Sequence, residues 1–406
     1  MAEIQPFAAV RPQPELAARI CAPPYDVMSE AEARERADRD PLSFVRVSRP
    51  EVQLPPGSRG DTPEAYAAAR RTFRELLAGG ALRQDAQASL YFYRQSTSTH
   101  SQTGLVALAS CADYEAGVIR RHELTRIEKE EDRVRHIEAL NAQTGPAFLF
   151  HAPDSALREV RDAVTEQPPD IDFTAEDGVR HTAWRVTAPG IVGQIRELFA
   201  AMPRLYIADG HHRSAAAVRV WKKKNRAPGY GGFLAVIFPW NELQILPYHR
   251  ILKDLNGKPP AKVLEEIARR CPPCPSAGKE PPGPGRFLVY VSGQWHGFHY
   301  PPADPSAAVV ERLDATRLQQ HVLGPVFGID DPRTSDRIDF VGGIHDLTEL
   351  KARVDSGKAA CAIAMAPTPI QALVEVADAG EIMPPKSTWF EPKLRDAMFC
   401  HLLPED

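Results

Sequence analysis

The feature that most restricts how this chain can fold is the proline-rich stretch CPPCPSAGKEPPGPG, residues 271–285. Proline has no backbone N–H and a fixed φ angle, so such a run sustains neither a helix nor a sheet ladder. We therefore predict that it links an N-terminal region, residues 1–270, to a C-terminal α/β region, residues 286–406. A chain of 406 residues is long enough for two or three domains of roughly 100–200 residues each.

Helix and strand patterns follow one another irregularly in both regions. Helical patterns cover residues 30–40, 63–80, 128–143, 212–225, 307–323, 346–358 and 372–380. Strand-like runs cover residues 89–95, 104–114, 203–210, 232–240, 243–252 and 361–367, with a hairpin over 286–300. Because the order is not a strict βα alternation, the pattern predicts an α+β fold.

The composition argues against several classes of protein. A net charge of −4 provides no general basic surface for nucleic acid. No apolar run approaches the roughly 20 residues that span a bilayer, and the N-terminal stretch lacks the apolar core of a signal peptide. We therefore expect a cytoplasmic protein without membrane contact. The closely spaced Cys271 and Cys274 are interpreted as incidental thiols in a loop, rather than as a redox pair or half of a zinc site.

Residues 207–217, IADGHHRSAAA, place an Asp-Gly turn between a strand and a helix. The glycine permits close approach to a ligand, and the first helical turn presents unpaired N–H groups at the positive end of its dipole. Arg213 adds a guanidinium fork that matches phosphate oxygens. Two other interpretations stay open: Asp209 caps the helix while the basic side chains are solvated, or the stretch is a metal site. His211 and His212 point about 100° apart on a helix, so they need a third ligand to bind one metal ion.

The stretch GVIRRHELTRIEKEEDRVRH, residues 117–136, joins a short strand-like segment to a charged helix. Its second half, Lys129 to His136, fits a solvated helix face with salt bridges. Its first half fits that interpretation poorly, because Arg-Arg-His-Glu-Leu-Thr lies at a strand end. Glu123 is a carboxylate among basic groups, as removal of a proton from an attacking hydroxyl requires.

Two further stretches hold polar side chains in rigid surroundings. MPPKSTWFEPK, residues 383–393, fits either a segment that closes over a nucleotide or phosphate or a surface loop docked by its aromatic rings. In APPYDV, residues 22–27, two prolines precede a polar pair, and Asp26 also fits the start of the next helix. The polar residues of these two stretches are Lys386, Ser387, Thr388 and Lys393 in the first, and Tyr25 and Asp26 in the second.

The motifs PPYDV, SFVRVSRPE, RRHELT with KEEDR, ADGHHR and MPPKST occur in an order that resembles domain-of-unknown-function family 1015 (DUF1015), a widespread prokaryotic family, over nearly the whole chain. The His-Glu and Asp-Gly-His-His-Arg motifs also resemble the free-serine kinases of the ParB/sulfiredoxin-like superfamily. That resemblance implies a ParB/sulfiredoxin-like core. Here residues 137–202 form a large insertion between the two motifs, and there are extra N- and C-terminal regions, so the acceptor substrate stays open.

The kinase resemblance implies ATP or ADP as donor, Mg²⁺ as cofactor, and phosphates bound at the start of the helix after the Gly-x-x-Arg turn. Matched residue by residue, Glu123 is the acid of the His-Glu motif, and Asp209 is the second acid, which faces the metal. The residues that match the phosphate-binding turn are Gly210, His211, His212 and Arg213. The substrate-binding candidates are His122, Arg120, Arg121, Thr125, Tyr25 and Asp26.

Together these motifs favour a nucleotide-dependent phosphotransferase that acts on the hydroxyl of a small molecule, L-serine or a related hydroxy acid, with Glu123 as base. One alternative is a ParB-like nucleotide- or nucleic-acid-binding regulator, which only the basic run at residues 221–226 supports. A helix C-terminus also explains that run. Another is a metal-dependent hydrolase built on His211 and His212, although an H-x-x-x-H spacing is missing. The sequence leaves open the choice between ATP and ADP and the oligomeric state, including a homo-oligomer.

Overall fold

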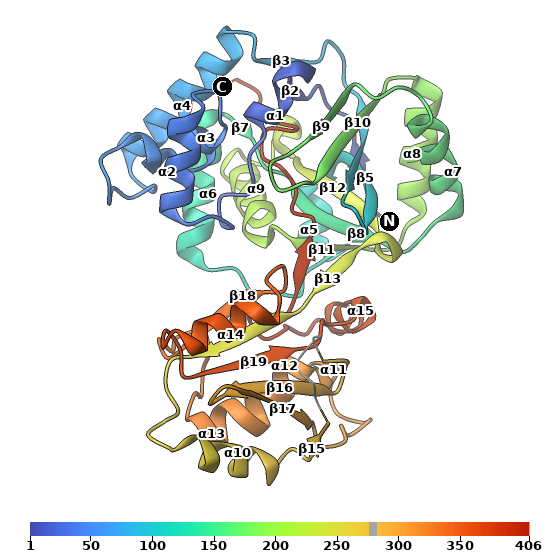
Figure 1. Ribbon diagram of the computed structural model, residues 1–406. Helices are drawn as coiled ribbons and strands as arrows, with labels where there is room; N and C mark the ends of the chain where they lie inside the picture. Colours follow the sequence, from blue (N-terminus) through green and yellow to red (C-terminus); the bar gives the residue numbers. More distant parts are fainter. Residues whose placement is uncertain (276–281, 406) are drawn as a thin grey trace. The chain divides into compact units, whose positions relative to one another are not determined.

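The computed structural model describes residues 1–275 and 282–405. Its chain divides into two compact units (Figure 1). The first unit comprises Met1–Leu243 and Pro392–Asp406, and the second comprises Gln244–Glu391. The division therefore differs from the one predicted at 271–285. The described part of that stretch belongs to the second unit, and residues 276–281 lie outside the described residues.

The first unit is built on a nine-stranded mixed sheet, which agrees with the predicted α+β class. Its strands are β1 (Ile4–Gln5), β4 (Leu90–Ser96), β5 (Ser101–Ser110), β6 (Ile119–Arg120), β8 (Ala147–His151), β9 (Ile171–Thr174), β10 (Arg180–Val186), β11 (Leu205–Asp209) and β12 (Gly232–Pro239). They are ordered β6-β11-β8-β12-β5-β4-β10-β9, and β1 pairs with β5. The β6–β11 and β8–β12 pairs are parallel, and the others are antiparallel.

Residues 137–202, which the sequence marks as an insertion, contribute three strands to this sheet. Strand β8 is buried along its whole length and lies between β11 and β12. Strands β10 and β9 extend the opposite end of the sheet from β4. The segment is therefore part of the framework of the first unit and not an appendage to it.

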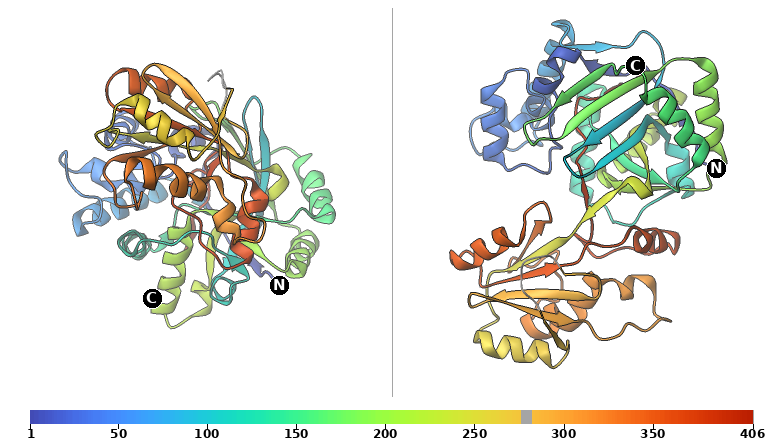
Figure 2. Two further views of the ribbon diagram at one scale, coloured as in Figure 1. Left: turned by 90° about the horizontal axis from the view of Figure 1, so that it is seen from below. Right: turned by 45° about the vertical axis from the view of Figure 1, so that its right-hand side comes forward.

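Helices of the first unit flank the sheet. They are α1 (Ala17–Ile20), α2 (Glu30–Arg39), α3 (Val45–Ser48), α4 (Pro63–Ala78), α5 (Cys111–Ala116), α6 (Ile127–Leu140), α7 (Ser155–Thr165), α8 (Pro189–Ala201) and α9 (His211–Lys223). Figures 1 and 2 show α2, α3 and α4, in blue, grouped on one side of the first unit, with α7 and α8 on the other. Helix α4 begins as its sequence predicts, since the Thr62 hydroxyl accepts a hydrogen bond from the Ala65 N–H and Pro63 occupies the first turn.

Two predicted strands differ from the structure: one ends earlier than its apolar pattern, and the other is divided in two. The strand predicted over 104–114 stops at Ser110, because the Ser110 side chain caps helix α5. The strand predicted over 243–252 is divided at Pro247, which has no N–H to pair, into β13 (Gln244–Leu246) and β14 (Tyr248–Leu252).

The second unit contains a six-stranded antiparallel sheet. In spatial order its strands are β15 (Pro273–Cys274), β17 (Gln294–His299), β16 (Arg286–Val291), β19 (Cys361–Met365), β14 and β18 (Ile338–Gly342). Its α-helices are α10 (Pro260–Ala268), α11 (Val309–Arg312), α12 (Asp314–Leu318), α13 (Gly324–Phe327), α14 (Leu347–Asp355) and α15 (Ile370–Asp378). The helix predicted over 307–323 is thus interrupted, at the extended residue Leu313.

The second sheet explains why the proline-rich stretch does not separate the units. Strand β14 precedes the stretch and β16 follows it, and both pair with β19. Part of the stretch itself enters this sheet, contrary to the expectation that such a run sustains no ladder, because Pro273 and Cys274 form β15 and pair with β17. Hydrogen bonds within one sheet therefore hold the chain before and after the stretch. Cys271 and Cys274 are free thiols, and Cys271 is buried. Within the described ranges, the chain has no helix with the length and apolar character that crossing a bilayer requires.

Figure 1 shows the C-terminal segment after Pro392 running into the first unit. A polar network centred on the buried Arg395 anchors it there. The Arg395 guanidinium donates to His181 Nε2 at 3.0 Å and to the carboxylate of Asp177. His181 Nδ1 lies 2.7 Å from the Tyr93 hydroxyl oxygen, and both of these side chains are fully buried. Because Nε2 accepts a hydrogen bond, the proton of the neutral imidazole is on Nδ1, which donates to Tyr93.

We expect Arg395→Ala to destabilise the first unit by about 3 kcal/mol, since it leaves His181 Nε2 buried without a donor. Hydrogen exchange of peptides from β4 and β10 measures the loss. Arg180→Ala is the matched control, because Arg180 is 59% exposed in its pair with Asp172, and its loss costs less than about 1 kcal/mol. Equal effects of the two substitutions would contradict the anchoring role.

Candidate functional site

Parallel pairing of β6 with β11 brings the two principal motifs to one edge of the main sheet. Ile119 lies opposite Leu205, and Arg120 lies opposite Tyr206. Strand β6 ends at Arg120, whereas β11 continues to Asp209. The segments that follow them, residues 121–126 and 210–213, lie side by side, since the Arg126 N–H donates to His212 Nε2. Helix α9 begins within the second segment, at His211, and packs against α6, which begins at Ile127.

The turn before α9 requires glycine. Gly210 has a φ of +84°, and a Cβ atom at this position would lie 3.1 Å from the Cα of Ala147. Asp209 Oδ1 accepts a hydrogen bond from the Gly210 N–H at 2.8 Å, so Asp209 precedes the helix and does not cap it. Among the described residues no side chain caps α9. Its first turn therefore offers an electropositive N-terminus toward the same edge.

The carboxylate of Asp209 is paired with a lysine from the C-terminal segment. Lys393 Nζ donates to Asp209 Oδ2 at 2.8 Å, and the Asp209 side chain remains 42% exposed. Desolvation opposes ionisation, but the positive charges of Lys393 and Arg213 hold the pKa of Asp209 far below its ordinary value. Asp209 is therefore an ionised, accessible carboxylate with a cation beside it.

Two buried histidines lie next to these charges. The rings of His122 and His211 are perpendicular, with centroids 4.6 Å apart. Burial lowers the pKa of His122 to about 4 and that of His211 well below its ordinary value, so both are neutral at pH 7. Glu123 Oε2 lies 4.0 Å from His211 Nδ1, and its side chain is 46% exposed. The negative charge of Asp209 acts against burial and raises the pKa of both histidines, although burial has the larger effect. Asp209 and Glu123 therefore both lie close to this pair of rings.

The other residues predicted for substrate or phosphate binding at this edge contact protein groups. His212 Nε2 accepts a hydrogen bond from the Arg126 N–H at 3.0 Å. The Thr125 hydroxyl bonds to the carboxylate of Glu130. The Arg121 guanidinium lies 5.0 Å from the centroid of the Tyr114 ring. These contacts hold the segment 121–126 against α5, α6 and α9.

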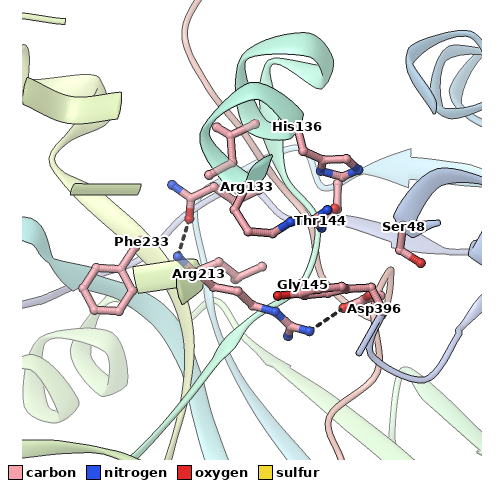
Figure 3. Close-up of a pocket in the computed structure, with 12 residues that line it drawn as sticks. Ser48, Arg133, His136, Thr144, Gly145, Arg213, Phe233 and Asp396 are labelled. Atoms are coloured by element: carbon pink, nitrogen blue, oxygen red, sulfur yellow. Dashed lines mark hydrogen bonds and ion pairs between the residues drawn. The ribbon is translucent and has the colours of Figure 1, made fainter. Parts of the chain in front are cut away.

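Arg213 points into a small cavity of about 40 Å³, shown in Figure 3. Its Nη1 donates to the Pro146 carbonyl at 2.9 Å, and its Nη2 lies 3.6 Å from Asp396 Oδ1. Asp396 is buried, and burial raises its pKa to about 6. A Cβ atom on Gly145 would overlap the Asp396 carboxylate, so glycine is needed for this contact.

Tyr25 lies between two guanidinium groups at the same cavity. Arg133 and Arg213 lie 4.1 and 5.6 Å from the centroid of its ring. Burial raises the pKa of the Tyr25 hydroxyl to about 12. Asp26 is exposed, and its charge acts on Arg213 and Asp396. Of the residues predicted for the site, Tyr25 and Asp26 thus accompany Arg213 rather than the histidine pair.

Lys386, Ser387 and Thr388 belong to the second unit. The Lys386 ammonium lies 5.5 Å from the centroid of the Tyr248 ring, and the Ser387 hydroxyl donates to the Pro384 carbonyl at 2.7 Å. Their role in binding a nucleotide stays a prediction.

Sequence reasoning missed the part that the C-terminal segment has in the site. The sequence pattern gives Lys393 only as one residue of a loop motif, and it does not single out Asp396. A signal was available for Asp396: the pair Arg395-Asp396 lies within the otherwise apolar run LRDAMFC, residues 394–400. Charged side chains in such a run are buried, and a buried charge needs a partner.

Comparison with known proteins gave one family and several solved structures. A family model described as "Protein of unknown function (DUF1015)" matches residues 4–316. No curated protein matches the chain. A free serine kinase in complex with AMP is 15% identical with a TM-score of 0.37, covering 67% of this chain and 83% of that one. A mutant of free serine kinase has been solved with ADP. SbnI with C-terminal truncation from Staphylococcus aureus is 12% identical with a TM-score of 0.37, covering 72% and 85% of the two chains.

The buried histidines predict that the first unit loses stability in acid. Burial lowers the pKa of His122 and His136 to about 4, and those of His181 and His211 lie well below the ordinary value of 6.5. The unfolded chain therefore binds more protons, and stability present above about pH 6.5 is lost as the pH falls toward 4. Each such histidine contributes ~1.4 kcal/mol per pH unit in that window.

Asp396 acts in the opposite sense, because its pKa is raised to about 6. One carboxyl group offsets only part of the effect of four histidines, so the net free energy of unfolding decreases. Urea unfolding at pH 7.5, 6.5 and 5.5 measures this, and His136→Gln should flatten the profile. A constant urea midpoint over this range would show that the histidines are not buried in the neutral form.

Proposed function

The chain belongs to the DUF1015 family, and we propose that it is a nucleotide-dependent phosphotransferase acting on the hydroxyl of a small molecule. The acceptor is free L-serine or a related hydroxy acid, the donor is ATP or ADP, and Mg²⁺ is the cofactor. One observation carries this proposal. Glu123 and the ion pair of Asp209 with Lys393 both lie beside the first turn of α9, which no side chain of the described residues caps.

Each part of this arrangement suits phosphoryl transfer. The reaction depends mainly on positioning and on compensation of phosphate charge. The N-terminus of α9 and the ammonium of Lys393 both favour phosphate oxygens. Glu123 is 46% exposed, so its carboxylate is accessible to an acceptor hydroxyl. Asp209 is ionised and 42% exposed, which suits it to the one or two carboxylates that Mg²⁺ takes in addition to phosphates and water.

In this mechanism Glu123 accepts the proton of the acceptor hydroxyl. The hydroxyl oxygen forms a bond to the terminal phosphorus, while the bond from that phosphorus to its bridging oxygen breaks. The nucleotide leaves with one phosphate fewer, and Lys393 and the N–H groups of α9 compensate the charge on the transferred group. Asp209 would hold Mg²⁺, and the ion would neutralise the phosphates of the donor when bound.

We propose a positioning role for Arg213 in place of the phosphate contact that its motif suggests. Its guanidinium is bonded to the Pro146 carbonyl and faces Asp396 within the cavity of Figure 3. We assign it to positioning, because it ties the first turn of α9 to the segment before β8. His122 and the arginines at 120 and 121 remain the candidates for the carboxylate of the acceptor.

The proposal predicts that Glu123→Gln lowers turnover by about 10²–10⁴-fold, since that is the usual contribution of a positioned base. Binding of ADP or ATP should persist, because the phosphate-binding groups are unchanged. Thermal shift with nucleotides and transfer of labelled phosphate to L-serine and other hydroxy acids provide the two readouts. Glu128→Gln, an exposed acid in the first turn of α6, is the matched control. Failure of every nucleotide to stabilise the native protein would exclude the proposal.

Lys393→Ala should weaken nucleotide binding about tenfold, the effect of losing roughly 1.4 kcal/mol from a charge-assisted contact. Isothermal titration with ADP measures it. Lys129→Ala serves as control, because Lys129 is exposed on α6. Unchanged affinity in Lys393→Ala would place the nucleotide elsewhere.

A further inference from the structure

Three potential metal ligands lie together beside the proposed phosphate site. His122, Glu123 and His211 each present one ligand atom, and these atoms lie within 4.8 Å of one another. The first two residues follow β6, and the third is the first residue of α9. The parallel pairing of β6 with β11 therefore holds the two halves of the group in place, 88 positions apart in the sequence (211 − 123).

Both histidines carry a ring nitrogen that the protein itself does not satisfy. His122 is 3% exposed and His211 is 5% exposed. Within the described residues, His122 Nδ1 and His211 Nε2 have no hydrogen-bond partner. A buried polar atom without a partner costs free energy, and such atoms are uncommon in native proteins. The two rings lie close together, with centroids 4.6 Å apart. The other nitrogen of the His211 ring, Nδ1, is the atom that lies 4.0 Å from Glu123 Oε2.

The protonation of His122 suits metal binding. His122 is hydrogen-bonded to the backbone of Ile207. Since Nδ1 has no partner, Nε2–H donates to the carbonyl of that residue, and the lone pair remains on Nδ1. A ligating histidine commonly donates its other ring N–H to a backbone carbonyl in this way, which fixes both the tautomer and the orientation of the ring.

The charges around the group also permit a cation. The positive end of α9 and the Arg121 guanidinium oppose a cation near His211. The carboxylates of Glu123 and Asp209 lie on the same side and offset this effect.

We propose that His122, Glu123 and His211 bind a divalent first-row transition-metal ion of the Zn²⁺ class. Two imidazoles and one carboxylate suit Zn²⁺, Co²⁺ or Mn²⁺, whereas Mg²⁺ takes oxygen ligands. Three protein ligands leave a coordination position for water or substrate, as in catalytic rather than structural zinc sites. Ligands about 2.0–2.2 Å from a tetrahedral ion lie roughly 3.4 Å apart, so the exposed Glu123 side chain moves toward the rings when the ion binds.

This site is distinct from the Mg²⁺ proposed at Asp209 and does not depend on phosphotransferase activity. Glu123 is common to both proposals, and His122, a candidate for the acceptor carboxylate in the first, is a metal ligand in the second. A carboxylate that binds a metal through one oxygen keeps the other oxygen for a proton, so the two roles are compatible.

The test is metal binding by the full chain in the absence of nucleotide and acceptor. Protein stripped with a chelator is dialysed against Zn²⁺, and bound metal is measured by mass spectrometry. Replacement by Co²⁺ gives a visible spectrum that reports imidazole ligation. All proteins carry Cys274→Ser, which removes a thiol that is partly exposed and that Zn²⁺ can bind. We expect one equivalent of metal, and losses of affinity of about 100-fold in His122→Asn and His211→Asn.

His212→Asn is the matched control, since this neighbouring histidine already accepts a hydrogen bond from the Arg126 N–H. It should retain one equivalent of metal and the same Co²⁺ spectrum. Thermal unfolding of the metal-free variants shows whether each has folded, and either of the two ligand histidines suffices for the test. Absence of a stoichiometric metal, or equal loss in the His212 variant, overturns the site. Metal binding without phosphate transfer would leave the site intact and remove only the proposed function.

Discussion

The parallel pairing of β6 with β11 is the constraint on which the candidate site depends. Parallel strands need a long crossover, and here the chain between them passes through α6, β8, α7, β9, β10 and α8 before it returns. Only two residue pairs define the register, Ile119 with Leu205 and Arg120 with Tyr206. A slip of one residue would turn each side chain to the other face of the sheet. The acids and the histidines would then no longer surround one space.

The short pairing is stabilised by contacts beyond the two strands. Strand β8 pairs with β11 on the side opposite β6, and α6 packs against α9 next to the motif segments. Gly210 allows the backbone of the turn to approach Ala147 at the start of β8. The segment between the motifs is therefore what holds them together, although it looks like an insertion in the sequence.

A second requirement is the return of the C-terminal segment to the first unit. Lys393 neutralises Asp209, and Asp396 faces Arg213 in the buried cavity. Both residues lie beyond the part of the chain that matches the family model, which ends at residue 316. The neighbouring Arg395 holds this segment through His181, so the electrostatics of the site and the stability of the first unit depend on the same few residues. Buried charges of this kind are costly unless paired, which limits the positions that the segment can take.

The sequence by itself determined the local elements. Helices α2, α4, α6 and α9, the hairpin of β16 with β17, and the strand–turn–helix that contains Gly210 follow from periodicity, caps and turn residues that lie within a few positions of one another. The tertiary structure alone decided the division of the chain at residue 243, the place of β8 inside the main sheet, and the pairing of Lys393 with Asp209. These features join segments far apart in the chain. Such contacts depend on burial and hydrogen bonding summed over a whole sheet, and no local pattern records that sum.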